Sequence, residues 1–384
     1  MANHMGSVAQ TLTERKRNPE LSASVLKPHM PGIDVLRGVA ILMVIVFHGF
    51  YYSASQFPWH NSFAKALFQV TSGGWAGVNL FFALSGFLIT GNLMDSEAKK
   101  NYYARFYARR ALRILPIYFL ILLTLGLLHL ASPLYLLLCG FFLANMPGIF
   151  LHGAYMSYGP LWSLAVEEQF YLVWPWLYRR LKMKGLLGLC LAMIVVCPLL
   201  RAAALDHVLK TGEVFSKTWM IADNLAMGAV IAILLRMTKM KLRTFLRFGV
   251  ATVAISAAGL ALLAATHHLV KEDVIGGSFG YSMIELMGAG WVIIMLYAYR
   301  QRPLQSWLKI FIFFGDISYG LYLIHMLCLE IYDRYAGQGF RTDAGALWTR
   351  FLICNGIAIL LAYLSKRFFE NPILKLKNRI PAAM

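Results

Sequence analysis

Charged residues are scarce in this chain and make up only 14% of its 384 positions. An ordinary soluble domain carries roughly 25% charged residues, and a water-soluble core cannot absorb the 59% of hydrophobic residues found here. The composition therefore excludes a water-soluble globular protein. Apolar runs of about 20 residues, the length of a helix that crosses the hydrocarbon layer, recur along the chain instead. We expect an all-α, polytopic bundle of membrane-spanning helices.

Cysteine is also rare, and no cysteine-based site is indicated. The five cysteines lie inside apolar stretches and form no CxxC pair, so neither a disulfide framework nor a metal site is expected. A cleavable signal peptide is missing as well, because residues 8–27 contain no apolar core. The opening MANHMGS resembles a remnant of an expression vector. Residues 1–30 are thus expected to form a disordered cytoplasmic tail.

Long loops and internal repeats are absent too, so residues 31–372 are expected to form one membrane domain, followed by a basic cytoplasmic tail at 373–384. We predict ten spans, at residues 33–52, 75–93, 114–130, 161–177, 186–204, 219–235, 248–266, 281–299, 311–331 and 347–364. Lys and Arg clusters follow the even-numbered spans, as the positive-inside rule expects of cytoplasmic loops. The protein should lie in the cell membrane with both termini in the cytoplasm. The net charge of +18 is then explained by the basic cytoplasmic loops, and no nucleic-acid partner is expected.

One further segment, residues 133–151, is apolar enough to cross the membrane. A crossing there would place every later basic cluster outside the cell. We therefore expect a re-entrant or protein-buried helix, because irregular backbone at membrane depth is tolerated only inside protein or around a cavity.

Ionisable side chains inside the predicted spans are candidates for function, because each costs free energy in lipid unless it is paired or hydrated. They are Asp34, Arg37, His48, Glu167, Glu168, Asp223, Glu285, His325 and Glu330. Arg37 and His48 are eleven positions apart, which is three helical turns, so both project from one face, with the imidazole about 16 Å deeper. A snorkelling arginine and a core histidine would explain the pair in structural terms. The carboxylates elsewhere in the bundle favour a functional interpretation.

Two adjacent carboxylates, Glu167 and Glu168, interrupt the fourth span and point about 100° apart on one helix. One of them is expected to form a structural salt bridge. The other is expected to orient His48, since an imidazole held by a carboxylate is suited to take a proton from a hydroxyl.

An arginine stripe precedes the third span, where Arg105, Arg109 and Arg113 recur at every fourth position with Arg110 beside them. Two interpretations fit this spacing. An interfacial amphipathic helix would contact anionic lipid, whereas a nucleotide site would use the arginine side chains to bind phosphate oxygens.

Small residues are concentrated in the second span, GGWAGVNLFFALSGFLITG, where they favour close helix packing or the passage of a ligand. Ser85 is a candidate for donor binding there. The loops at 52–74, 145–159, 205–217, 267–280 and 333–345 fall outside the cell in this topology, and aromatics such as Trp59, Tyr155 and Tyr158 suit either sugar rings or an interfacial belt. Weaker candidates for binding the acceptor are Asp34, Trp75, Asn79, Trp162, Ser318, Tyr322 and His325.

Five segments in order resemble the acyltransferase 3 family of membrane acyltransferases, namely IDVLRGVAILMVIVFH, GWAGVNLFFALSGFLIT, YARRALRILPIY, LWSLAVEEQFYLVWP and ISYGLYLIH. The resemblance covers residues 31–372 and implies a stand-alone form without a fused extracytoplasmic domain. It implies transfer of an acyl group, usually acetyl, from acyl-CoA on the cytoplasmic side to a hydroxyl of a saccharide or glycolipid. On the matching positions it implies roles for Arg37 with His48, Arg110 with Arg113, Glu167 with Glu168, and Ser318, Tyr319, Tyr322 and His325.

The resulting hypothesis makes His48 the general base and places the donor phosphates on Arg105, Arg109, Arg110 or Arg113, with Ser85 and Tyr319 beside the donor. Arg37 or a backbone amide would stabilise the oxyanion. Direct transfer and an acyl-histidine intermediate both fit, and direct transfer is favoured. Alternatives are transfer to a macrolide-type small molecule, a transporter without its own chemistry, and a binding protein. The acceptor and the oligomeric state are not specified by the sequence.

Overall fold

The computed structural model describes residues 26, 30–52, 62–97, 101–146, 158–207, 211–237, 240–300, 305–337, 339–341 and 343–376. Within these ranges all regular structure is helical and no strand occurs. The predicted tail at 1–30 lies almost entirely outside the described residues, as do Trp59 and Tyr155. The boundary predicted at 372/373 falls inside the helix α17 (Asn371–Lys375).

Ten long helices form the bundle, and each overlaps one predicted span. They are α3 (Pro31–Val46), α5 (Ala76–Ser96), α6 (Tyr102–Leu127), α9 (Leu161–Arg180), α10 (Met183–His207), α12 (Thr218–Met237), α13 (Leu242–Ala265), α14 (Tyr281–Ala298), α15 (Lys309–Tyr335) and α16 (Ala344–Ser365). Nine of the described helical segments are long and apolar enough to cross a membrane. The tenth expected span, α9, reaches about 30 Å at 1.5 Å per residue, although Glu167, Glu168 and Gln169 interrupt its apolar sequence. The all-α membrane fold is confirmed.

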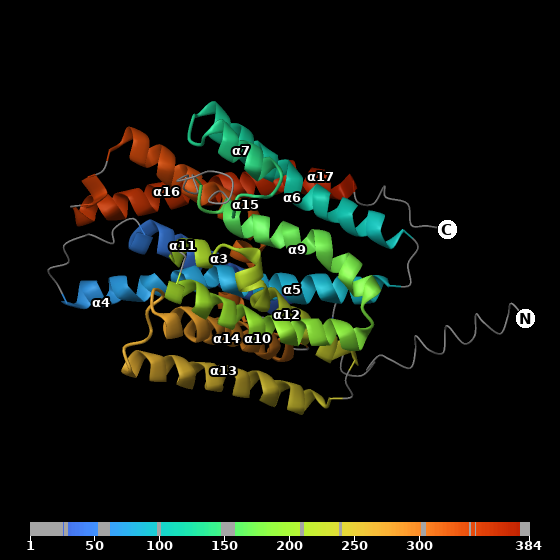
Figure 1. Ribbon diagram of the computed structural model, residues 1–384. Helices are drawn as coiled ribbons and strands as arrows, with labels where there is room; N and C mark the ends of the chain where they lie inside the picture. Colours follow the sequence, from blue (N-terminus) through green and yellow to red (C-terminus); the bar gives the residue numbers. More distant parts are fainter. Residues whose placement is uncertain are drawn as a thin grey trace, which may run out of the picture.

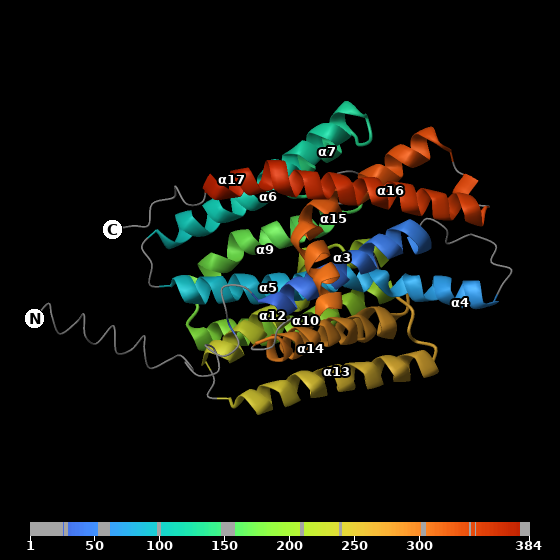
Figure 2. The same cartoon turned by 180° about the vertical axis from the view of Figure 1, so that it is seen from behind.

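Shorter elements join or extend these helices. They are η1 (Phe47–Tyr52), α4 (Ser62–Thr71), η2 (Ser72–Trp75), α7 (Pro133–Gly140), α11 (Thr211–Val214), η3 (Gly276–Gly280), η4 (Ser306–Leu308), η5 (Gly339–Arg341) and η6 (Lys366–Glu370). Figures 1 and 2 show α13 at one edge of the bundle and α7 with α16 at the opposite edge. The helices α5 and α12 are the most deeply buried and α13 is the least. The core therefore lies between the two edges, around α3, α5, α12 and α15.

Glycines bring the central helices into close contact. A Cβ atom on Gly38 of α3 would overlap the carbonyl oxygen of Phe311 on α15, and one on Gly315 would overlap that of Asp34. The pair α5 and α12 is built in the same way, by Gly86 and Gly228. Bare backbone lets the helices approach at these points, as the packing interpretation of the glycines predicts.

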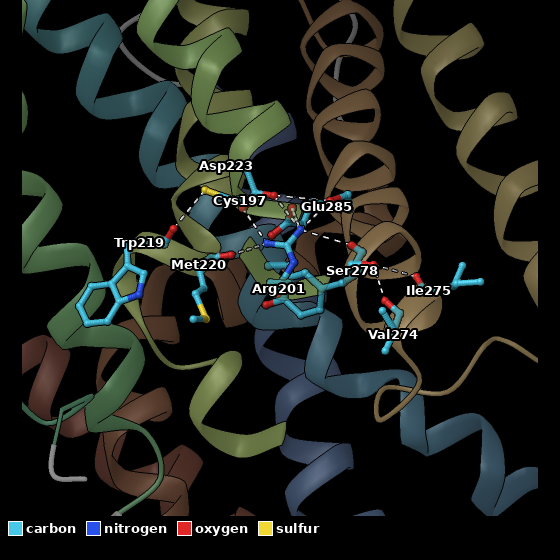
Figure 3. A network of polar contacts seen from close by, with 12 residues as sticks. Cys197, Arg201, Trp219, Met220, Asp223, Val274, Ile275, Ser278 and Glu285 are labelled. Atoms are coloured by element: carbon cyan, nitrogen blue, oxygen red, sulfur yellow. Dashed lines mark hydrogen bonds and ion pairs between the residues drawn. The ribbon is translucent and has the colours of Figure 1, made fainter. Parts of the chain in front are cut away.

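A buried ion-pair cluster connects α10, α12 and α14 (Figure 3). Arg201 binds both carboxylate oxygens of Asp223, at 3.0 and 2.8 Å, and lies 3.8 Å from the carboxylate of Glu285. It also donates to Ser282 at 2.6 Å. All three charged side chains are fully buried. The candidate list from the sequence contained both carboxylates but omitted Arg201, although it lies inside the span predicted at 186–204.

The segment predicted to be re-entrant or buried does not cross the bundle in its described part. The helix α7 has only 8 residues, which is about 12 Å of rise. The irregular backbone at 141–146 that follows is held by polar contacts inside the protein, since Gln169 of α9 donates to Phe142 and to Asn145, and Asn145 donates to Thr218. These hydrogen bonds explain how non-helical backbone is accommodated at 141–146, whereas residues 147–151 of the predicted segment lie outside the described residues.

Candidate active site

A cavity of about 110 Å³ lies among five helices of the bundle, large enough to admit several water-sized groups. Its polar lining comes from α3, α5, α6, α9 and α15. The polar residues are Arg37, Ser85, Arg110, Arg113, Ser163, Glu167, Tyr171, Ser318, Tyr319 and Tyr322. Three cations and one carboxylate thus surround a space at membrane depth, where unpaired charge is costly. Such an arrangement is typical of a site that binds an anion.

Two of the cavity arginines belong to the predicted stripe. The stripe is not a separate interfacial helix, because α6 runs without interruption from Tyr102 to Leu127 and carries its arginines into the bundle. Arg110 lies over the ring of Tyr171, with its guanidinium carbon 4.1 Å from the ring centroid. Arg113 lines the cavity and also reaches the surface of the bundle.

The other two arginines of the stripe, Arg105 and Arg109, do not line this cavity. They lie one to two turns nearer the start of α6, and Arg109 is exposed. Arg37 enters the cavity from α3 and forms an ion pair with Asp34, at 3.9 Å. The site thus combines arginines from two helices, and the spacing within α6 could not reveal this combination.

Glu167 is fixed at the cavity wall by hydroxyl groups. The hydroxyl of Ser85 donates to Glu167 at 2.6 Å, and the hydroxyl of Tyr171 donates to Ser85 at 3.0 Å. Glu168 points elsewhere, as predicted, and its Oε1 is buried without a hydrogen-bond partner among the described residues. Ser163 and Tyr171 were not predicted, although their spacing of four residues on either side of Glu167 places all three on one helix face.

The segment ISYGLYLIH on α15 supplies another part of the cavity wall. Tyr319 donates to the carbonyl of Ile114 at 2.9 Å, and the hydroxyls of Tyr322 and Ser163 are 2.6 Å apart. Ser318 donates to the carbonyl of Gly315 at 2.8 Å. These contacts fix three of the predicted residues at the cavity, and Tyr322 connects α15 with α9.

His48 and His325 form a hydrogen-bonded pair, with 3.1 Å between His48 Nδ1 and His325 Nε2. Nδ1 of His325 lies 3.0 Å from the carbonyl oxygen of Leu321. Since a carbonyl only accepts, that nitrogen carries the hydrogen, and His325 Nε2 accepts one from His48. With both rings neutral, the hydrogen of His48 is therefore assigned to Nδ1, and Nε2 carries none. His48 is thus held in the tautomer that can take a proton through Nε2.

His48 does not itself line the cavity, which ends at Tyr322. The ring of Tyr322 is 6.0 Å from that of His325, and His325 is 5.1 Å from His48, measured between centroids. The π-helical turn η1, where helix geometry departs from α, carries His48 toward α15. Tyr322 of the cavity wall is thus a neighbour of His325, which in turn contacts the candidate base.

Three weaker candidates lie outside the cavity, nearer the start of α5 and α9. Trp75 stacks on Tyr281 with 5.3 Å between ring centroids, and Asn79 accepts a hydrogen bond from the Tyr281 hydroxyl at 3.2 Å. Trp162 packs against Phe82. No group of three or more potential metal ligands occurs among the described residues.

The sequence of this chain is similar to those of known acyltransferases. Residues 30–367 match the acyltransferase domain family. The chain is 26% identical over 387 positions to the peptidoglycan O-acetyltransferase OatA of Listeria monocytogenes, covering 91% of this chain and 56% of that relative. It is 25% identical to the O-acetyltransferase OatA of Staphylococcus aureus, covering 90% and 57%. A putative peptidoglycan O-acetyltransferase, YrhL of Bacillus subtilis, is 32% identical over 196 positions, which are 44% of this chain and 27% of the relative.

No solved structure matches this sequence. The chain spans a little over half the length of the two OatA relatives, at 56% and 57%. The family match extends over most of the predicted membrane domain and includes every residue of the arginine cavity. This chain belongs to the acyltransferase domain family of membrane proteins.

Proposed function

We propose that the protein transfers an acyl group, most readily acetyl, from acyl-CoA to a hydroxyl of a saccharide or glycolipid, with His48 as the general base. The arginine cavity beside a hydrogen-bonded histidine pair is the observation that carries this proposal. The peptidoglycan O-acetyltransferases among the relatives support a saccharide acceptor and an acetyl group. The donor is expected to enter from the cytoplasm, where the positive-inside rule places both termini.

The donor phosphates are assigned to Arg110, Arg113 and Arg37, which share one cavity. Arginine binds phosphate oxygens with paired hydrogen bonds, and its charge is not lost on burial as easily as that of lysine. Exposure of Arg113 gives the anion an entrance. Arg105 and Arg109, nearer the start of α6, remain candidates for guiding the nucleotide toward this entrance.

Arg37 is too far from the reacting atoms to stabilise an oxyanion there. It precedes His48 by eleven residues, which is about 16 Å along the helix. An extended pantetheine arm has a comparable length, so a donor held at Arg37 can present its thioester near His48. We therefore propose that Arg37 binds the donor phosphates and does not stabilise the oxyanion. Ser85 of α5 lies on the cavity wall along this path, whereas the glycines Gly77, Gly86 and Gly91 of α5 pack against α3 and α12.

His48 is oriented by His325 in this proposal, because Glu167 is bonded to Ser85 instead. The unprotonated Nε2 of His48 takes the proton of the acceptor hydroxyl as the oxygen attacks the thioester carbon. The carbon–sulfur bond then breaks, and the thiolate of coenzyme A takes the proton from His48. Transfer is direct, and Tyr322 must yield for the thioester to reach the histidines.

Binding of coenzyme A to purified variants tests the donor site. Arg113→Gln and Arg110→Gln should each weaken binding about tenfold or more, because each removes a charge-assisted contact. Arg243→Gln is the control, since Arg243 is exposed and lies on α13, which contributes no residue to the cavity. Equal affinity for coenzyme A in all three variants and the parent protein would refute the assignment of the donor phosphates to this cavity.

A further inference from the structure

An aromatic cluster capped by a lysine lies at the end of the bundle opposite to the arginine entrance. Lys271 belongs to the loop between α13 and η3. Its Nζ is 4.3 Å from the ring centroid of Trp75, 4.4 Å from that of Phe215 and 5.8 Å from that of Tyr281. Tyr281 stacks on both other rings. Segments that are far apart in sequence thus build one platform for a single ammonium group.

The loop that carries Lys271 is held in place by hydrogen bonds and close backbone packing. Asp273 accepts hydrogen bonds from the backbone amides of Ile275 and Gly276, both at 2.9 Å, and pairs with His268 at 3.2 Å. A Cβ atom at Gly276 would overlap carbonyl oxygens of the loop, so the loop backbone packs directly on η3. Lys271 is thereby placed over the platform by the backbone.

The ammonium group of Lys271 has no ion-pair partner in the part of the chain that the structure describes. Glu272 is exposed and forms no ion pair with it, Asp273 is occupied by His268, and Arg201 below Tyr281 is bound to Asp223. Burial lowers the pKa of Lys271 to about 8. Figure 3 shows Ser278, with Val274 and Ile275 beside it, next to the Arg201 cluster. A partly buried cation that lacks an anion is equipped to bind one from outside.

The platform lies about one helical turn from the cavity. Trp75 precedes Val78 by one helical turn, and Val78 lines the cavity. Asn79, one residue further, is bonded to Tyr281 of the platform. A ligand that covers the partly exposed ring of Trp75 would therefore lie near the end of the cavity that is farther from Arg110 and Arg113.

We propose that Lys271 and Trp75 form a subsite that recognises an anionic group on the saccharide acceptor. This inference rests on the proposed acyl transfer and adds the chemical class of its acceptor. The flat indole suits the apolar face of a sugar ring, and the ammonium group suits a carboxylate or phosphate substituent beside it.

The test measures binding of two soluble glycans to the full chain in detergent, without any donor. One probe is the disaccharide of N-acetylglucosamine and N-acetylmuramic acid, which carries a carboxylate, and the other is neutral chitobiose. We expect the charged glycan to bind about tenfold more tightly. Lys271→Met should abolish this preference and Lys271→Arg should retain it, while Lys65→Met, an exposed lysine of α4, is the control.

Equal binding of the two glycans by the parent protein without competition by inorganic phosphate, or a preference that survives Lys271→Met, would overturn the proposal. Binding of neither glycan would overturn it too. Competition by inorganic phosphate separates the two kinds of anion, since strong competition with a weak effect of the carboxylate assigns the subsite to a phosphate substituent. Acyl transfer is assayed separately, so a protein that prefers the charged glycan but releases no coenzyme A refutes the proposed function alone.

Discussion

Replacement of His325 should reduce the catalytic rate without affecting substrate binding. His325 Nε2 is 3.1 Å from His48 Nδ1, and its own Nδ1 is held by the carbonyl of Leu321. His325→Ala removes one of the hydrogen-bond partners that orient the ring of His48. His325 does not line the cavity, so the donor site should be unchanged.

The size of the effect follows from the role of His48. A general base contributes about 10²–10⁴ in rate, and the loss of its orienting partner should remove part of this contribution. We expect kcat to fall about 100-fold, which is about 2.7 kcal/mol of activation free energy, while both KM values stay within about twofold. His325→Gln should recover part of the rate, because an amide oxygen can accept the same hydrogen bond.

The assay is release of coenzyme A by purified protein with saturating donor and acceptor. His267→Asn is a control, because His267 is exposed and adopts a positive φ of 61° that asparagine tolerates. A His325→Ala protein with unchanged kcat would refute the orienting role. Equal losses in His325→Ala and His325→Gln, together with a lowered unfolding temperature, would indicate a packing role instead.

Three further results are expected. Gly38→Ala should lower the free energy of unfolding by about 1–3 kcal/mol, because its Cβ would overlap the backbone of α15, whereas Gly356→Ala, with no atom within 4 Å, should be neutral or slightly stabilising; thermal unfolding in detergent checks both. Arg201→Met should cost about 3–5 kcal/mol in the same assay, since it leaves a buried carboxylate unpaired, and adding Asp223→Asn should recover part of the loss. Binding of the anionic glycan should weaken as the pH rises through about 8, where Lys271 loses its proton, and Lys271→Arg should bind equally well above that pH.

The fold was largely predictable from the sequence because the bilayer imposes strong constraints on length and polarity. Ten predicted spans overlap ten helices, and residues 133–151 do not cross the bundle in their described part because charge placement and buried polar contacts oppose it. The arginine spacing before the third span was typical of a helix, but its continuity with that span as the single helix α6 was not predicted, since its first turns are basic and do not resemble a span. Residues at the start of α6 can thus be helical although they are not apolar enough to be recognised as a membrane span.

Much of the candidate site was also predicted, but the pairings were not. Local spacing placed Glu167 and Arg113 on the correct helices, and the structure brings both to one cavity. The partnership of His48 with His325 joins positions 277 residues apart, and no pattern within one helix can show it. Arg201 lies inside a predicted span and met the same criterion as Asp223 and Glu285, but it was left off the candidate list, and only the structure shows its pairing with both carboxylates.

The most direct test of the account is a His48→Gln protein measured for both donor binding and transfer. The account places the donor phosphates on the arginines of the cavity and the proton transfer on His48, about 16 Å away along the helix. Coenzyme A should therefore bind with the affinity of the parent protein, while acyl transfer should fall by about 100-fold or more. Transfer at the parental rate would contradict the assignment of the base, and loss of both activities would contradict the separation of the two sites.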